Sequence, residues 1–442
     1  MNYQEALDWL AQLERFGVRL GLQRIQRLLA LLGNPQERYK TIHVTGTNGK
    51  GSVSALLAGI LQASGIHAGF YSSPHLVSYT ERVRVDGQPV SEDEFAAGLT
   101  KVRALVAQML AEGAECPTQF EVLTALAFDL FAAHGVEYAV IEVGLGGTLD
   151  STNVITPEVA VITNVTFEHA AVLGGTIESI ADNKAGIIKE GVPVVTAAQG
   201  LPLEIIRQRA AEKNADIFVA GADFSAEPRG CDGRHQQLAF TSALLGIAAE
   251  PFALHLLGSY QVENAAVAIM TAYLLHNGDA RIDTPTIREA VRLVTWPARF
   301  ERLEEAGQSI IVDGAHNPAG MRSLRTSLDT VFPAEERVLL LGILRDKDIS
   351  TMLQTILRPN DTVVVTTPQS ARAELPENIA RQAAPLCQHV EAFADNDEAL
   401  ARALELANGQ KLLVLAGSLY LVGGLRQRLL TRAEQLREDQ HE

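Results

Sequence analysis

The chain has 442 residues, of which 47% are hydrophobic and 20% are charged, and its formal net charge at neutral pH is -16. A chain of this length is too long for one typical hydrophobic core, so two domains are expected. The negative charge argues against a nucleic-acid-binding protein, which would normally present a basic face. Small anionic substrates are not excluded, because a local cluster of lysine and arginine can override the global charge.

The cysteines and the N-terminal segment indicate a cellular compartment. Cys116, Cys231 and Cys387 are far apart and form neither a metal-binding nor a disulfide pattern. The N-terminal MNYQEALDWLAQLERFG has the spacing of an amphipathic helix and lacks the basic start of a signal peptide. No apolar run approaches the roughly 18 residues that a membrane span needs. A cytoplasmic protein is therefore expected.

Short apolar runs alternate with longer amphipathic stretches along the first half of the chain. The runs predict strands buried on both faces, as in a parallel sheet. They are KTIHVTG (40–46), HAGFYSS (67–73), YAVIEVG (138–144), EVAVITNV (158–165) and PVVTAA (193–198). The stretches between them predict helices over 51–64, 92–111, 119–134 and 176–189. Weaker alternation over 216–257 predicts a few antiparallel strands, and a helix is expected over 261–275.

A second strand–helix series follows TWPARFERL (295–303). Its strands are expected at 309–314, 337–344, 361–367 and 411–417. Because Trp296-Pro297 breaks the preceding helix, the domain boundary is placed there. The predicted fold class is α/β. A P-loop-containing, doubly wound, mostly parallel sheet domain over 1–295 is followed by a smaller Rossmann-like α/β domain over 296–442.

The loop Gly46-Thr47-Asn48-Gly49-Lys50-Gly51-Ser52 lies between a predicted strand and a predicted helix. Glycines let backbone N–H groups turn toward anionic oxygens, and the helix N-terminus adds partial positive charge. Lys50 would reach the β- and γ-phosphates of a nucleotide, and Ser52 could ligate the accompanying Mg²⁺. The pattern departs from the common GxxxxGK[ST] form, because Gly51 separates Lys50 from Ser52. A turn whose glycines serve only the backbone is the alternative, and phosphate binding alone selects no reaction.

Polar residues follow several of the predicted strands, at the sheet edge where ligands gather. Glu142 ends a buried strand, which would rarely hold an unpaired carboxylate. With Ser73 and His169 it forms a candidate Mg²⁺ site, although histidine is an uncommon ligand for so hard a cation. Lys184 falls on a predicted helix with a spacing compatible with a partly inward position. A surface lysine that extends its ammonium into water is the alternative.

The segment VDGAHNPAG (312–320) ends the first strand of the second series. One interpretation is a polar turn in which Asn317 caps the following helix and Pro318 takes its first position. The other is contact with substrate or nucleotide through Asp313 and His316. Arg299 could likewise pair with phosphate or make an interdomain ion pair.

The order of these motifs is that of the folylpolyglutamate synthases, which belong to the Mur-type amide ligase superfamily. The chain resembles that family through GTNGKGS, SSPHLVSYTERVRVDG, EVGLGGTLDSTN, TNVTFEHAAVLGGTIESIADNKAGIIK, QVENAAVA, WPARFE and VDGAHNPAG. The resemblance extends from LGLQRIQRLL near one end to LAGSLYLVGG near the other. It therefore covers nearly the whole chain.

The resemblance implies an ATP-dependent ligase. The carboxylate of dihydropteroate, or the γ-carboxylate of a folate's last glutamate, would attack ATP to give an acyl phosphate and ADP. The amine of L-glutamate would then displace phosphate. Phosphoryl transfer between anions needs dense positive charge, and domain closure excludes water from the acyl phosphate. The expected partners are these small molecules, with no nucleic acid and no membrane, and a monomer is expected.

The resemblance also implies roles for individual residues. The implied catalytic residues are Lys50, Lys184, His316 and Asp150. The implied nucleotide-binding residues are Gly46, Thr47, Asn48, Gly49, Lys50, Gly51, Ser52, Asn264, Arg299, Asp313 and His316. Two Mg²⁺ ions are implied, and their ligands are Ser73, Glu142, His169 and Ser52. The residues implied at the pterin and carboxylate end are Arg82, Phe120, Asp150 and Ser151. Lys184 is expected to be N6-carboxylysine, because a carbamate is an anion that can lie beside metal.

Three positions depart from the family pattern. The family's Asp-His is Glu168-His169 here, and Thr148 stands where bacterial members commonly have arginine. Gly258-Ser259-Tyr260-Gln261 replaces the frequent GxHQ. None of the three removes a group that would touch metal or nucleotide, so any effect is expected on substrate preference.

Several activities remain to be distinguished. SSPHLVSYTERVRV resembles the segment of bifunctional bacterial enzymes, so both dihydrofolate synthesis and extension of the glutamate tail are expected. A monofunctional folylpolyglutamate synthase is the alternative within the family. The alternatives from other classes of protein are a P-loop kinase or NTPase and a regulatory nucleotide-binding module. A Mur enzyme of cell-wall synthesis is not expected, because it usually has a separate N-terminal domain before its phosphate loop.

Overall fold

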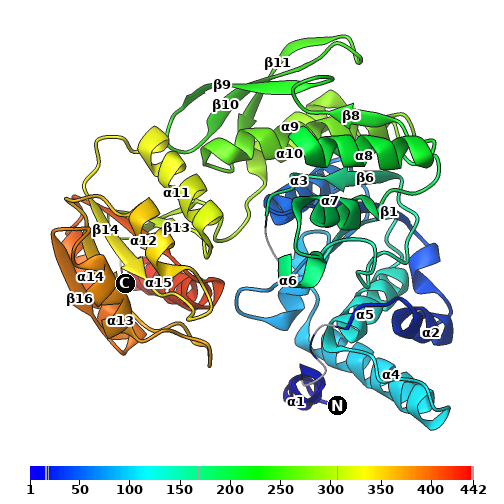
Figure 1. Ribbon diagram of the computed structural model, residues 1–442, viewed down its shortest axis with the longest axis horizontal. Coiled ribbons are helices and arrows are strands. Elements are labelled where there is room, and N and C mark those ends of the chain that lie inside the picture. The colour runs from blue at the N-terminus through cyan, green and yellow to red at the C-terminus, as the bar shows by residue number, and fades with distance from the viewer. Residues whose placement is uncertain (15–16, 18, 168–169, 306, 440–442) are drawn as a thin grey trace. The chain divides into compact units, whose positions relative to one another are not determined.

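The structure is a computed structural model that describes residues 1–14, 17, 19–167, 170–305 and 307–439. The chain divides into two compact units (Figure 1). Unit 1 comprises Met1–Glu227, Leu238–Ala253 and Glu263–Val294, and unit 2 comprises Pro228–Gln237, Leu254–Val262 and Thr295–Glu442. No helix in the described ranges is both long enough and apolar enough to span a membrane.

Helices and strands alternate along both units. As far as Leu254 the elements are α1 (Tyr3–Leu13), α2 (Gln23–Leu31), η2 (Pro35–Glu37), β1 (Lys40–Thr45), α3 (Lys50–Ala63), β2 (Ala68–Tyr71), η3 (Tyr79–Arg82), β3 (Val83–Val85), β4 (Gln88–Pro89), α4 (Glu92–Ala111), α5 (Gln119–His134), β5 (Tyr138–Glu142), β6 (Val159–Ile162), α6 (Ala170–Leu173), α7 (Ile177–Ala185), β7 (Val194–Thr196), α8 (Gly200–Glu212), β8 (Ile217–Val219), β9 (Ser225–Cys231), β10 (Gln236–Ser242) and β11 (Ile247–Leu254). The remaining elements are α9 (Ser259–His276), α10 (Thr284–Leu293), β12 (Glu301–Glu305), β13 (Gln308–Val312), α11 (Pro318–Val331), β14 (Arg337–Leu341), α12 (Ile349–Ile356), β15 (Thr362–Val365), α13 (Pro376–Ala383), β16 (His389–Ala392), α14 (Asn396–Ala407), β17 (Leu412–Ala416) and α15 (Leu419–Asp439).

Unit 1 is built on an eight-stranded sheet in the order β4-β3-β2-β5-β1-β6-β7-β8. The strands from β2 to β8 in this order are parallel, whereas β3 and β4 add an antiparallel edge. On one face, Ile141 packs in a core with α4 and α5, and Ile162 packs in a core with α7 and α8. Residues that alternate with them, such as Val140, face the other side, and α3 packs against β1, β2 and β5.

Capping explains why several predicted helices have the expected bounds. Ser91 begins α4 and Thr118 begins α5, each in a reciprocal capping box with the glutamate three residues later. Helix α7 is shorter than predicted, because it ends at Ala185 rather than near 189. The prediction was too long there because Ile187 and Ile188 are apolar, but these residues fill the core without being helical.

The weakly alternating segment after β8 forms the three-stranded sheet β11-β10-β9, in which short turns join consecutive strands. Antiparallel pairing is the arrangement that such turns allow. Each of its strands includes residues assigned to both units.

Unit 2 is built on a six-stranded sheet in the order β12-β13-β17-β14-β15-β16. Only β12 runs antiparallel to its neighbour. Gln236 Nε2 donates to the carbonyls of Leu256 and Gly258, and Arg302 Nη1 donates to that of Gly233. These bonds tie segments 228–237 and 254–262 to unit 2. The α/β class with two mostly parallel sheets is confirmed, and the domains 1–295 and 296–442 stay a prediction.

A buried ion pair links β14 to the start of β15. Arg337 Nε and Nη2 donate to the two carboxylate oxygens of Asp361 at 3.1 and 3.0 Å, and both side chains are buried. We predict that Asp361→Ala lowers the free energy of unfolding by about 3 kcal/mol, because the buried guanidinium loses its bidentate partner and keeps only Asp329, whose Oδ1 lies 3.7 Å from Nη1. Urea denaturation measures this. Arg292→Ala, which breaks an exposed pair with Glu289, is the control and should change little. An equal effect of both variants would contradict the prediction.

Candidate active site

The loop after β1 follows a path that leaves no room for side chains at two points. Gly46 and Gly49 have φ angles of +149° and +84°. A Cβ on Gly46 would collide with Thr163 Oγ1, and a Cβ on Gly49 would collide with Asn264 Oδ1. The loop therefore packs directly against the end of β6 and against α9, which carries the predicted nucleotide residue Asn264.

Residues that the sequence analysis did not select hold this loop. The backbone N–H of Thr47 donates to the carbonyl of Asn164 at 2.8 Å, and that of Asn48 donates to Asn164 Oδ1 at 2.9 Å. The hydroxyl of Thr163 donates to the carbonyl of Asn48 at 2.6 Å. Thr163 and Asn164 could have been identified from the sequence, because they form a polar pair directly after an apolar strand.

Two lysine ammonium groups meet at one carbonyl of the loop. Lys50 Nζ donates to the carbonyls of Gly46 and Thr47 at 3.0 and 3.1 Å. Lys184 Nζ donates to the same Gly46 oxygen at 2.7 Å from the last turn of α7. The Lys184 side chain is only 5% exposed, so the alternative of a surface lysine is wrong. Positive charge is thus concentrated beside the predicted phosphate site.

Three of the predicted metal ligands, Ser52, Ser73 and Glu142, lie at or near the carboxyl edge of the same sheet. Glu142 is buried at the end of β5, and its Oε2 lies 3.4 Å from the backbone N of Ser73. Ser52 is buried in the first turn of α3, whereas Glu168 and His169 lie outside the described residues. No group of three or more His, Cys, Asp or Glu in the described ranges is arranged to hold a metal ion. The side-chain oxygen atoms of Glu142, Ser73 and Ser52 nevertheless fit a hard cation such as Mg²⁺.

The predicted residue Asp150 organises the loop that follows β5. Its Oδ1 accepts from the backbone N and the hydroxyl of Thr152 at 3.0 and 2.5 Å, and its Oδ2 accepts from the backbone N of Leu145 at 2.9 Å. Burial raises the pKa of the Asp150 carboxyl, while these donors act in the opposite direction. Ser151 beside it is also buried. The carboxyl of Asp150 therefore fixes residues 144–152, and its catalytic role stays a prediction.

The loop 144–152 also contacts the ends of three other elements. Thr45 Oγ1 of β1 donates to the carbonyl of Gly146 at 2.6 Å. Thr148, the departure from the family arginine, donates through its N and its hydroxyl to the carbonyl of Asn183 at 2.9 and 3.0 Å. A Cβ on Gly144 would collide with the ring of Phe120. The loop thus joins the phosphate strand, the Lys184 helix and the predicted substrate residue Phe120.

Tyr71, which the sequence analysis did not single out, lies among residues predicted for substrate and metal. Burial raises the pKa of its hydroxyl, Arg82 lowers it, and the carboxylates of Asp150 and Glu142 raise it further. These three charges therefore lie close enough to Tyr71 to act on it. Arg82 Nε also donates to His75 Nδ1 at 2.9 Å. Tyr71 also lies beside the predicted substrate residue Phe120, with ring centroids 6.1 Å apart.

In unit 2, Asp313 holds a strained turn. Its Oδ2 accepts from the backbone N of Phe300 at 2.7 Å and from the hydroxyl of Tyr260 at 3.2 Å. Ala298 and Phe300 have φ angles of +55° and +51°, which are unfavourable for residues other than glycine. Burial raises the pKa of Asp313, and the charge of Arg299 opposes this. The departure at Tyr260 thus supplies a donor to the predicted nucleotide residue.

The turn after β13 has the capped geometry that its sequence predicted. Asn317 Oδ1 accepts from the backbone N of Gly320 at 2.6 Å, and Pro318 opens α11. Half-buried His316 has its Nδ1 2.8 Å from the carbonyl of Gly314. The capping interpretation is confirmed, and nucleotide or substrate contact by His316 stays a prediction.

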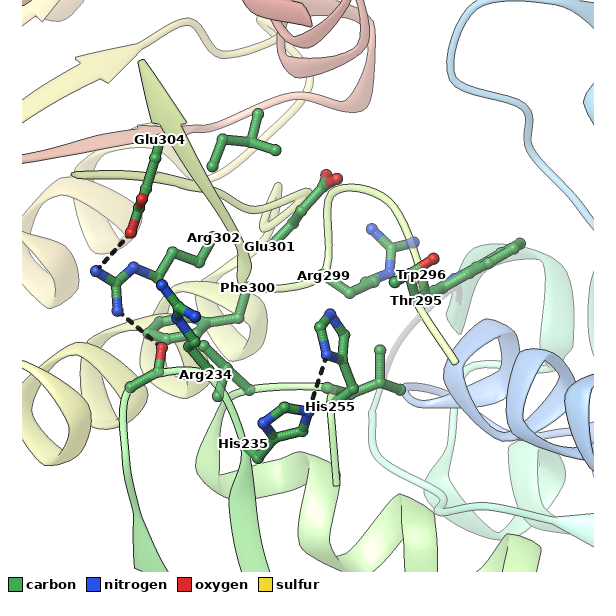
Figure 2. Close-up of a pocket in the computed structure, with 14 residues that line it drawn as sticks. Arg234, His235, His255, Thr295, Trp296, Arg299, Phe300, Glu301, Arg302 and Glu304 are labelled. Carbon is green, nitrogen blue, oxygen red and sulfur yellow. Dashed lines mark hydrogen bonds and ion pairs between the residues drawn. The ribbon is translucent and has the colours of Figure 1, made fainter. Parts of the chain in front are cut away.

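Unit 2 also contains a cavity of about 440 Å³ beside Arg299. Figure 2 shows the rings of His235 and His255 close together there, with Arg302 hydrogen-bonded to Glu304. Asp313 and His316 are not among its lining residues. Among the unit 2 residues that are predicted to bind nucleotide, only Arg299 lines this cavity.

The fold and this site define an ATP-dependent ligase of the Mur type. Residues 44–272 match the Mur ligase middle domain, and residues 298–419 match the Mur ligase, glutamate ligase domain. The folylpolyglutamate synthase of Lacticaseibacillus casei is 37% identical and covers 97% of this chain and 99% of its own. The dihydrofolate synthase/folylpolyglutamate synthase of Bacillus subtilis (strain 168) is 33% identical, with the same coverage.

A solved structure agrees with both matches. The folylpolyglutamate synthase of Mycobacterium tuberculosis, solved in complex with ADP and AMPPCP, superimposes with a TM-score of 0.86. It is 32% identical, and the match covers 97% of this chain and 99% of that one. The chain belongs to the folylpolyglutamate and dihydrofolate synthase family.

Nucleotide binding should depend on the tight packing of the phosphate loop. Gly49→Ala should weaken binding of Mg²⁺-AMPPCP by at least about tenfold, because the new methyl group must displace Asn264 from a backbone already at positive φ. Isothermal titration calorimetry measures the binding. Gly65→Ala is the matched control, since Gly65 also has a positive φ but no neighbour within 4 Å of a Cβ. Equal binding by the two variants would refute the role given to the close approach.

Proposed function

We propose that this chain ligates L-glutamate to dihydropteroate and to the γ-carboxylate of a reduced folate, at the expense of ATP. The observation that carries the proposal is the phosphate loop 46–52, which packs on Thr163 and Asn264 with no room for a Cβ and places Lys50 Nζ on the Gly46 carbonyl. A glycine-lined loop with a lysine ammonium suits a reaction between a carboxylate and a triphosphate, both of which are anions. Relatives named for each of the two activities support the choice of acceptors.

The proposed reaction has two steps. A carboxylate oxygen of the acceptor attacks the γ-phosphorus of ATP, the bond to the β,γ-bridging oxygen breaks, and ADP leaves. The amine nitrogen of glutamate then attacks the acyl carbon, phosphate leaves with the former carboxylate oxygen, and the nitrogen loses a proton. The N–H groups of the loop 46–52 and the Lys50 ammonium would hold the phosphates.

Other residues of both units have further proposed tasks. Ser52, Ser73 and Glu142 would hold Mg²⁺, which neutralises charge on the phosphates when it is bound. Arg82, Phe120, Asp150 and Ser151 would line the pterin and carboxylate end. The residues proposed for adenosine and phosphate are Asn264, Arg299, Asp313 and His316. N6-carboxylation of Lys184, a second Mg²⁺ with His169, a monomeric state and a cytoplasmic location are also part of the proposal.

Release of ADP should depend on which substrates are present. Purified protein with Mg²⁺ and ATP should release ADP only when glutamate and either dihydropteroate or tetrahydrofolate are both present. A coupled ADP assay and chromatography of the product measure this. Lys50→Ala should lower turnover by at least about 100-fold, since one preorganised charge contact is worth that much. Lys101→Ala, which removes an exposed ammonium, should leave it unchanged.

The alternatives give different results in the same assay. Release without any acceptor would indicate an NTPase, and no release with any substrate pair would indicate a binding module. Release with tetrahydrofolate but not with dihydropteroate would indicate a monofunctional folylpolyglutamate synthase.

A second prediction tests the carbamate at Lys184. Lys184→Ala should lose most activity, on the order of 100-fold, because an anion beside the metal site is lost. Short carboxylates such as formate or acetate should restore part of it, since they can occupy the emptied space. The readout is turnover against carboxylate concentration, and Lys50→Ala should not respond. Full activity of Lys184→Ala without any carboxylate would rule out the assigned role.

A further inference from the structure

His43 is a polar side chain in the middle of the central strand β1. The strand pairs with β5 and β6, where Ile141 and Ala160 are the register partners of His43. The imidazole is fully buried, with 0% exposure.

A chain of hydrogen bonds leads from His43 to Asp150. The hydroxyl of Thr152 donates to Asp150 Oδ1 at 2.5 Å, and His43 Nε2 lies 2.8 Å from the same hydroxyl oxygen. A threonine hydroxyl has only one proton. Because that proton goes to Asp150, His43 Nε2 must be the donor to Thr152. The network thus assigns the Nε2–H tautomer, and His43 acts on the carboxylate through Thr152.

β1 holds the loop 144–152 at a second point, on the same side of the sheet. His43 and Thr45 are two residues apart, so their side chains share one face of the strand. Thr45 holds Gly146 near the start of the loop, and His43 holds Thr152 at its end. The strand that leads into the phosphate loop therefore also sets the position of the loop that carries Asp150.

Stability does not explain the imidazole. His43 Nδ1 is buried and has no hydrogen-bond partner in the described part of the chain. A buried polar atom without a partner costs free energy of folding, and an apolar residue of similar size would avoid that cost. The ring is also neutral, because burial and the nearby charge of Lys189 lower its pKa to about 3. It therefore does not pair with Asp150 as an ion.

We propose that His43 is a positioning residue, which orients the Thr152 hydroxyl toward Asp150 and so fixes the loop that receives the pterin-bearing substrate. The assignment of that substrate rests on the proposed function. The hydrogen bonds themselves do not depend on it.

His43→Leu tests the proposal, because it removes the donor and fills the space with an apolar side chain. We expect kcat/KM for dihydropteroate or tetrahydrofolate to fall on the order of tenfold, as for loss of one buried hydrogen bond. Most of the loss should lie in the KM for that substrate, with the KM for ATP within about twofold of wild type. His43→Gln, which keeps an N–H donor of similar reach, should restore most of the loss.

The stability of the same variants separates positioning from a structural role. His43→Leu should unfold at the same or a higher denaturant concentration than wild type, although its activity is lower. Thr152→Val should lower kcat/KM as His43→Leu does, and the double variant should be no worse than either single one. Thr152→Ser keeps the hydroxyl and serves as the matched control.

The pH dependence of unfolding gives a readout independent of activity. The folded-state pKa of His43 is about 3, below the value near 6.5 of an unfolded histidine. The unfolded chain therefore binds one more proton between these pH values, and stability is lost as pH falls below about 6.5. His43→Leu should remove one proton from this dependence.

Three results would overturn the proposal. They are an unchanged kcat/KM in His43→Leu, a loss that follows reduced stability, and equal losses in the Leu and Gln variants. Inactive wild-type protein would instead refute the proposed function, and the pH dependence of unfolding would still report on the buried neutral imidazole.

Discussion

The constraint on which the site depends is the close approach of the loop after β1 to its neighbours. β1 is paired on both edges by parallel strands, so the chain can leave it only at the carboxyl edge of the sheet. There the backbone at Gly46 and Gly49 lies against Thr163 and Asn264, with no space for a Cβ. This packing directs the Gly46 carbonyl toward two ammonium groups, which fixes Lys50 and Lys184 relative to one another. The local excess of positive charge follows from backbone geometry, in a chain whose net charge is negative.

In unit 2, hydrogen bonds to a buried carboxylate hold a loop in place. The predicted nucleotide carboxylate, Asp313, directly follows the strand β13. Its donors come from the turn 298–300, where two residues hold left-handed backbone conformations. Such a turn is unfavourable alone, so the hydrogen bonds of Asp313 offset its strain. The side chain of Arg299 projects from this turn, and its charge acts on the carboxylate that holds the turn in place. In both units a buried carboxylate therefore determines a loop conformation: Asp150 that of the loop 144–152, and Asp313 that of the turn 298–300.

The sequence was sufficient for most of the elements and insufficient where contacts join distant segments, and the roles of the site residues stay predictions. Helices α4 and α5 were predicted with their observed bounds, because their capping boxes lie within four residues of sequence. The inward position of Lys184 could not be decided from spacing alone, since the helical pattern allowed an exposed ammonium as well. Tyr71 was missed because aromatic residues are common in buried strands. The contact of Gly49 with Asn264 joins segments more than 200 residues apart, and no local pattern encodes it.

The buried polar groups around the carboxyl edge of unit 1 form one connected system rather than separate sites. Asp150 fixes the loop 144–152, and Thr148 of that loop binds the carbonyl of Asn183, the residue before Lys184. Lys184 in turn binds Gly46 of the phosphate loop, which follows directly on Thr45, and Thr45 binds the first loop again at Gly146. A shift of any one segment would therefore break hydrogen bonds in the next, and a break at Thr45, Asp150 or Lys184 would leave a buried polar group unpaired. Cooperative constraint of this kind holds reacting groups in a fixed geometry, which a short-lived acyl phosphate requires. Phosphate loop, lysine helix and substrate loop are thus positioned together, so that a change in one is transmitted to the others through hydrogen bonds rather than through a change of fold.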